Sequence, residues 1–181
     1  MPTISVRWPG AGQIQQQEAW CWAAATATLI DCFGGGARSQ AQIVHEWLMS
    51  DSAEADEIVN NYRAWIDSFQ VLIPTWENVR AQVEANPPAT ELMNLANGNT
   101  LPGVAMEFTD LSGQTVAAIA GLIEGGGLYV LGSAYHWYIL YGADIETGEL
   151  LVWDPNVGAV TREADWLANL AAYQVTGYAA P

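Results

Sequence analysis

Basic residues are scarce in this chain, which has five Lys and Arg against 20 Asp and Glu and a formal net charge of −15. Proteins that bind nucleic acids neutralise phosphates with Lys and Arg, so this scarcity argues against DNA or RNA as a partner. It argues equally against binding to an anionic membrane surface. The acidic excess favours solubility and suits a substrate of basic character.

Cysteine and histidine are also rare, with two of each. Cys21 and Cys32 fall on one predicted helix, where a rise of about 1.5 Å per residue separates them by about 16 Å, too far for a disulfide. We therefore expect two free thiols and assign Cys32 to the core. The two histidines, His45 and His136, are not clustered with the cysteines, so no zinc signature is present and no cofactor or metal is predicted.

Long hydrophobic runs are missing, because no stretch of about 18 uninterrupted apolar residues occurs that could span a membrane. Apolar residues nevertheless make up 51% of the 181 residues, and nine Trp and seven Tyr supply bulky core material. A chain of this length predicts a single domain over residues 1–181. The N-terminus lacks the basic segment and long apolar core of a signal peptide, so the expected location is the cytoplasm by default.

Two halves of different character make up this domain. Residues 1–100 are predicted to be mainly helical after an initial loop, with helices at 21–33, 40–49, 51–69, 75–84 and 91–96. Residues 101–181 are predicted to be mainly β, with strands at 103–108, 128–132, 136–142, 150–154 and 173–178 and helical segments at 114–123 and 165–170. The sequence thus indicates an α+β chain with an antiparallel sheet in its C-terminal half.

The most informative stretch is 15–25, Gln-Gln-Gln-Glu-Ala-Trp-Cys-Trp-Ala-Ala-Ala. A polar loop gives way here to the apolar run Ala23 to Ile30, which is typical of a buried helix, and Cys21 is expected in its first turn. Unpaired N–H groups and the positive end of the helix dipole stabilise a thiolate there. We therefore interpret Cys21 as a nucleophile; taken alone, it would more simply be a small buried apolar residue.

A second candidate group lies in the predicted sheet. His136 opens one strand, and the next strand ends at Asp154 in an Asp-Pro-Asn turn. Two consecutive antiparallel strands joined near residues 146–148 bring the start of the first beside the end of the second, so Asp154 is expected to orient the His136 imidazole. Each residue alone has a simpler explanation, as an ordinary surface or core His and as a turn residue. Together with Cys21 they form one coherent candidate site.

The arrangement of these residues resembles the papain-like cysteine peptidases. It consists of Gln15, five residues, then Cys21-Trp22-Ala23, with His136 and Asp154 downstream. The closer likeness is to the bacterial branch related to double-glycine leader peptidases and to papain-like effector proteases. It extends over about residues 10–36 and 125–160. Asp154 departs from papain itself, since papain-type enzymes usually have Asn there, but Asp is normal in the bacterial branch.

The resemblance implies a papain-like fold in which the helix that bears Cys21 packs on the antiparallel sheet. It also implies a role for each residue of the group. Cys21 would be the nucleophile, His136 the general acid and base, and Asp154 the residue that fixes the imidazole. Trp22 and Trp153 would pack around the site and keep it dry.

Gln15 would donate its side-chain amide to the oxyanion, alongside the backbone N–H of Cys21. Gln16 and Gln17 are rivals for this role, and only the spacing favours Gln15. His45 is assigned to structure because it has no ligand partner at a suitable spacing.

The implied activity is hydrolysis of peptide bonds in a protein or peptide substrate. Two alternatives stay open at this point. One is an amidase, deamidase or acyltransferase with the same triad, acting for example on cell-wall peptides. The other is a catalytically silent papain-like binding domain, against which the intact Gln, Cys, His and Asp set argues. The likeness to effectors also suggests a different location, in which the protein is exported or delivered into another cell.

Overall fold

The computed structural model of the protein describes residues 3–5, 12–16, 20–40, 42–43, 101, 103–133 and 136–178. Several predictions fall outside these residues: those for His45 and Gln17 and for the helices at 51–69, 75–84, 91–96 and most of 40–49. The start of this last helix is described. Ser39 Oγ accepts the N–H of Gln42 at 3.2 Å, and Gln42 Oε1 accepts the N–H of Ser39 at 2.9 Å, so these two residues cap the start of the helix.

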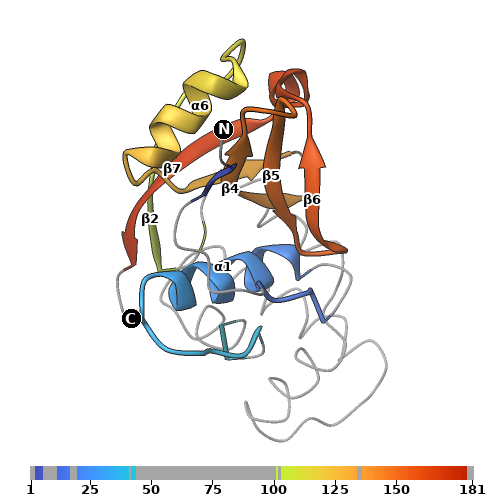
Figure 1. Ribbon diagram of the computed structural model, residues 1–181. Coiled ribbons are helices and arrows are strands. Elements are labelled where there is room, and N and C mark those ends of the chain that lie inside the picture. Colours follow the sequence, from blue (N-terminus) through green and yellow to red (C-terminus); the bar gives the residue numbers. More distant parts are fainter. Residues whose placement is uncertain are drawn as a thin grey trace, which may run out of the picture.

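An antiparallel sheet forms the centre of the described part of the protein (Figure 1). Its spatial order is β2-β7-β3-β4-β5-β6, and the short β1 pairs with the end of β4 beyond the residues that pair with β3. The strands are β1 (Thr3–Ser5), β2 (Val104–Phe108), β3 (Tyr129–Gly132), β4 (Trp137–Asp144), β5 (Glu149–Asp154), β6 (Gly158–Arg162) and β7 (Ala171–Tyr178). The predicted antiparallel C-terminal sheet is therefore confirmed.

Two strands of this sheet, the short β1 and the edge strand β6, were not predicted from the sequence. Strand β6 has the sequence Gly-Ala-Val-Thr-Arg, directly after the turn that follows β5. It lies at the edge of the sheet, and most of its residues are exposed or half-buried, so it lacks the alternation of large apolar residues that indicates a strand. The predicted helical segment at 165–170 is a 3-10 helix, η1 (Ala164–Asn169).

Helix α1 (Cys21–Cys32) begins at the cysteine, as predicted, and its first ten residues are all buried. Because these residues are buried on every side of the helix, α1 has no polar face. Its run of Ala23, Ala24 and Ala25 has small side chains, which allow neighbouring segments to approach closely. The helix ends at Cys32. Phe33 is its C-cap and donates its N–H to the carbonyl of Leu29, and Gly34 follows with a φ of 75°.

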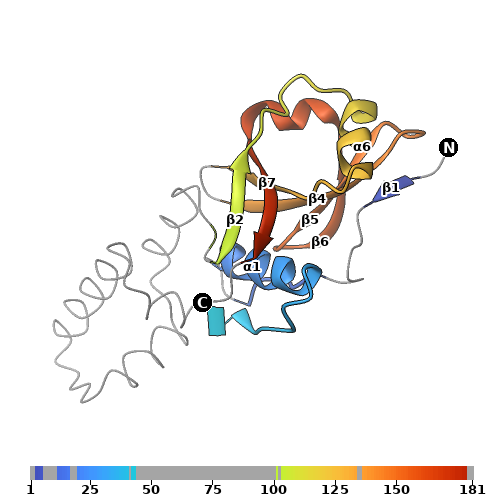
Figure 2. The same cartoon turned by 90° about the vertical axis from the view of Figure 1, so that its left-hand side faces the viewer.

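The sheet separates two apolar clusters, because side chains alternate along its strands. One cluster joins α1 to the side chains of Val130, Trp137, Ile139, Trp153 and Val175. The other joins Leu131, Leu140, Leu150 and Val152 to helix α6 (Val116–Glu124), which is capped by Thr115. Figure 2 shows α1 and α6 on either side of the sheet. Among the described residues, no helix has both the length and the apolar character needed to cross a membrane.

Candidate active site

The hairpin of β4 and β5 brings two of the predicted site residues together. The strands pair antiparallel with Ile139 opposite Trp153, and they are joined by a turn in which Gly148 has a φ of 75°. His136 lies just before β4 and Asp154 is the last residue of β5, so both leave the same end of the hairpin. The predicted adjacency of these two residues follows from this register and is confirmed.

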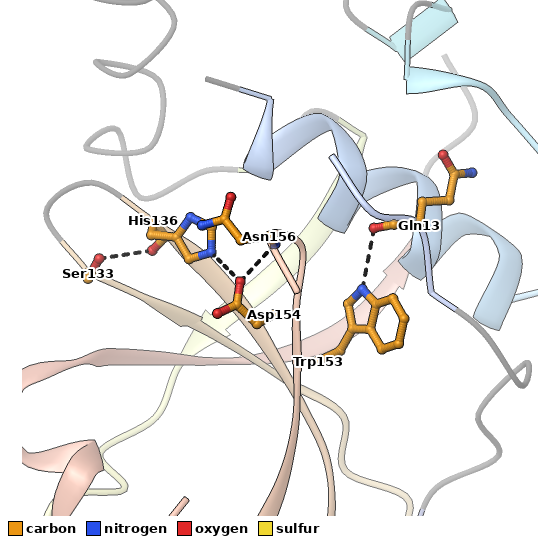
Figure 3. Close-up of polar contacts among 6 residues, drawn as sticks. All are labelled: Gln13, Ser133, His136, Trp153, Asp154 and Asn156. Carbon is orange, nitrogen blue, oxygen red and sulfur yellow. Dashed lines mark hydrogen bonds and ion pairs between the residues drawn. The ribbon is translucent and has the colours of Figure 1, made fainter. Parts of the chain in front are cut away.

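The His136 imidazole and the Asp154 carboxylate form a hydrogen bond of 2.8 Å between Nε2 and Oδ1 (Figure 3). Oδ1 also accepts the backbone N–H of Asn156 at 2.8 Å. Asp154 thus shapes the turn and holds the imidazole at once, which unites the two interpretations that the sequence left open. The side chains of His136 and Asp154 are only 14% and 11% exposed, so little water competes for the hydrogen bond between them.

The backbone and the ring of His136 have further supports. The backbone N–H of Ser133 donates to the His136 carbonyl at 2.8 Å, and the Ser133 hydroxyl donates to the same oxygen at 3.2 Å (Figure 3). The ring of Tyr138 lies edge-on to the imidazole, with centroids 4.6 Å apart. Trp166 in turn lies edge-on to Tyr138 at 5.0 Å, and Arg162 Cζ lies 5.4 Å from the Trp166 ring centroid.

These aromatic supports were missed in the sequence. One signal was available for Tyr138, because residues two apart on a strand point to the same face and Tyr138 follows His136 by two. Nothing in the sequence links Trp166 to this place, since it reaches the site only through the 3-10 helix that precedes β7.

The Cys21 sulfur lies at the start of β4. The backbone N–H of Trp137 points at it, as do those of Trp22 and Cys21 itself, and these contacts lower the pKa of the thiol. Burial has a larger effect and raises that pKa above the ordinary value of 9.0, and the negative charge of Asp154 raises it further. Our prediction of a readily ionised thiol is therefore wrong, because desolvation outweighs the N–H groups at the helix start.

The second thiol is half-buried and packs against the apolar cluster around α1, so it lies at the margin of the core rather than within it as predicted. Cys32 lies at the other end of α1, is free, and has a pKa raised to about 11, first by burial and then by the charge of Asp31. No disulfide links it to Cys21, as predicted.

The loop that carries Gln15 lies against the end of the hairpin. The backbone N–H of Gln15 donates to the Pro155 carbonyl at 2.8 Å, and Trp153 Nε1 donates to the Gln13 carbonyl at 3.3 Å (Figure 3). Gly12 is required for this approach, because a Cβ there would lie 2.5 Å from the Trp153 ring. Gln15 is half-buried whereas Gln16 is exposed, which favours Gln15 over this rival.

In the part of the chain that the structure describes, no three His, Cys, Asp or Glu side chains gather in a way that could hold a metal ion. The site therefore consists of a thiol, an imidazole, a carboxylate and an amide-bearing loop. Such a set can transfer protons and form a covalent bond to an acyl carbon.

Comparisons with known proteins add a single likeness to these observations. No family model matches the sequence, and no curated protein matches it. A solved structure, described as "Crystal structure of a double glycine motif protease from AMS/PCAT transporter in complex with the leader peptide", is similar at 12% identity and a TM-score of 0.44, over 97% of this chain and 100% of that one. A likeness this weak assigns neither fold nor activity.

Proposed function

We propose that the protein is a cysteine peptidase, which hydrolyses peptide bonds with Cys21, His136, Asp154 and Gln15. The observation that carries the proposal is the meeting of α1 with the end of the β4–β5 hairpin. There His136 bonds Asp154 at 2.8 Å, and the N–H of Trp137, the next residue, points at the Cys21 sulfur. A nucleophile, a base and an orienting carboxylate are the groups that acyl transfer through a thiol requires.

The tautomer of the imidazole determines the direction of proton transfer in this proposal. A carboxylate accepts hydrogen bonds, so the 2.8 Å contact requires the proton on Nε2 of His136. Nδ1 then accepts the thiol proton of Cys21, and the resulting imidazolium is stabilised by the charge of Asp154. Burial raises the pKa of the thiol, so we propose that transfer of its proton to Nδ1 accompanies attack on the substrate carbonyl.

Two donors would stabilise the oxyanion that forms on attack. One is the Cys21 backbone N–H at the first residue of α1, and the other is the side-chain amide of Gln15. Collapse of the tetrahedral intermediate breaks the C–N bond, and the imidazolium gives its proton to the leaving amine. Water, activated by the neutral His136, then hydrolyses the thioester and restores the thiol.

Mass spectrometry of a peptide library incubated with the protein tests this proposal, with muropeptides as a parallel substrate set. We expect new peptide termini from the wild-type protein and none from Cys21→Ala. Cys32→Ala is the matched control, since it removes the half-buried thiol at the other end of the same helix and should retain cleavage. Products from muropeptides alone would assign an amidase instead, and cleavage that survives in Cys21→Ala would overturn the thiol mechanism.

A further inference from the structure

A buried side chain outside the triad holds the loop that carries Gln15. Gln40 is only 1% exposed, and its amide faces the loop at residues 13–16. Its Nε2 donates to the Ile14 carbonyl at 2.7 Å and to Gln13 Oε1 at 3.3 Å. Its Oε1 accepts the backbone N–H of Gln16 at 2.9 Å. Both ends of this amide are therefore used by one short stretch of loop.

The two backbone contacts lie on either side of Gln15. The Ile14 carbonyl belongs to the peptide unit before Gln15, and the Gln16 N–H belongs to the unit after it. The orientation of these two units defines φ and ψ of Gln15, because the peptide bond itself is planar. A single amide of Gln40 thus fixes the backbone conformation at the residue proposed as the oxyanion donor.

Other contacts fix the position of the loop but not the conformation at this residue. Gln13 donates its N–H to Thr28 Oγ1 at 2.9 Å and its side-chain amide to the Arg38 carbonyl at 2.7 Å. The Gln15 N–H reaches the Pro155 carbonyl. None of these contacts holds the peptide unit that follows Gln15, which is the one bound by Gln40 Oε1.

We propose that Gln40 is a positioning residue, which orients the Gln15 side chain toward the oxyanion by fixing the two peptide units around it. This inference rests on the proposed peptidase activity and extends it beyond the triad. Preorganised donors stabilise an oxyanion far better than donors that must first be ordered, because no reorganisation is needed during the reaction. Loss of Gln40 should therefore affect the chemical step more than substrate binding.

The test compares Gln40→Met, which keeps the volume and removes the amide, with Gln114→Met, the same exchange at an exposed residue outside the loop and its contacts. We expect Gln40→Met to lower kcat about tenfold, less than loss of Gln15 itself, with KM within about twofold of wild type. Gln114→Met should leave both values within about twofold. Alkylation of Cys21 by iodoacetamide should be unchanged in both variants, since that reaction forms no oxyanion.

Hydrogen exchange provides a second readout that does not depend on activity. In Gln40→Met the amide of Gln16 loses its acceptor, so its exchange should accelerate about tenfold, and the side-chain amide signals of Gln15 should shift. If the variant does not fold, Gln40→Asn, whose amide ends one methylene short of the loop, replaces it. A wild-type protein that cleaves no peptide would defeat the proposed function, whereas exchange at Gln16 would still decide the role of Gln40.

The exchange, kcat and alkylation of Gln40→Met together decide whether Gln40 is a positioning residue. Faster exchange with a lower kcat and unchanged alkylation supports the positioning role. Unchanged exchange at Gln16, or faster exchange with an unchanged kcat, overturns it. Slower alkylation of Cys21 would assign the effect to a general distortion of the site and would also overturn it.

Discussion

Two parts of the candidate site are built by different means. The imidazole and its carboxylate lie at the end of a β-hairpin, where a ladder of backbone hydrogen bonds sets their separation. The glutamine lies on an irregular loop, where the side chains of Gln40, Thr28 and Trp153 hold the backbone. Backbone pairing tolerates most side-chain substitutions, but a loop held by side chains depends on each of them. The loop is therefore the part of the site where distant substitutions should have the greatest effect.

The largest effect is expected on the hairpin side, from Asp154→Ala. Removal of the carboxylate takes away the acceptor for His136 and the support of the imidazolium, so kcat/KM should fall by about 10³–10⁴. Asp154→Asn should cause a partial loss, because the amide oxygen still accepts the Nε2–H but carries no full charge. The acidic limb of the pH–rate profile should also move in this variant.

If Asp154 only shapes the turn through its bond to the Asn156 N–H, the Asn variant should be nearly silent. Wild-type kcat/KM in Asp154→Ala with an unmoved pH profile would show that the third member of the triad lies elsewhere. Asn156 would then be the next residue to substitute.

The next effect concerns the loop side and its donor. Gln15→Ala should lower kcat by about 10²–10³ with little change in KM, because the donated hydrogen bond strengthens as charge develops on the oxygen. Gln16→Ala is the natural control, since its side chain is exposed and its loop contact uses only the backbone. A loss of kcat in Gln16→Ala with none in Gln15→Ala would reassign the donor by one residue and leave the thiol mechanism intact.

The smallest effect concerns thiol ionisation, which is measured by alkylation as a function of pH. Burial raises the pKa of Cys21, so without a base its thiolate appears only above the ordinary value of 9.0. His136→Ala should therefore slow alkylation of Cys21 about tenfold at neutral pH and restore it in alkali. Cys32, whose pKa is raised to about 11, should stay unlabelled at neutral pH in both proteins. Equal labelling of the two thiols would contradict this difference.

Sequence patterns predicted the parts of the site that depend on local order along the chain. The change from a Gln-rich loop to an apolar run located the start of α1 at Cys21, and the turn near Gly148 predicted the hairpin that joins His136 to Asp154. The raised pKa of Cys21 was not predictable in the same way. It results from how completely other segments cover the helix start, and the sequence of the helix contains no measure of that cover.

Contacts between distant segments account for what was missed. Gln40 opens a helix that the sequence predicted, but its polar groups reach across to the loop at 13–16, and a buried Gln there has no periodic signal. Strand β6 is defined by its pairing with β5 rather than by apolar alternation. Trp166 contacts Tyr138 from η1, which connects β6 to β7 and is distant in sequence from Tyr138.

The complete burial of the first ten residues of α1 has a consequence for synthesis of the protein. A short helix without a polar face is not stable in water by itself, so α1 becomes stable only when the strands that cover it have folded. Those strands, and His136 with them, leave the ribosome long after Cys21. If the protein is a peptidase, Cys21 therefore has neither His136 nor Asp154 beside it on the nascent chain, and the enzyme becomes competent only when the sheet packs on the helix.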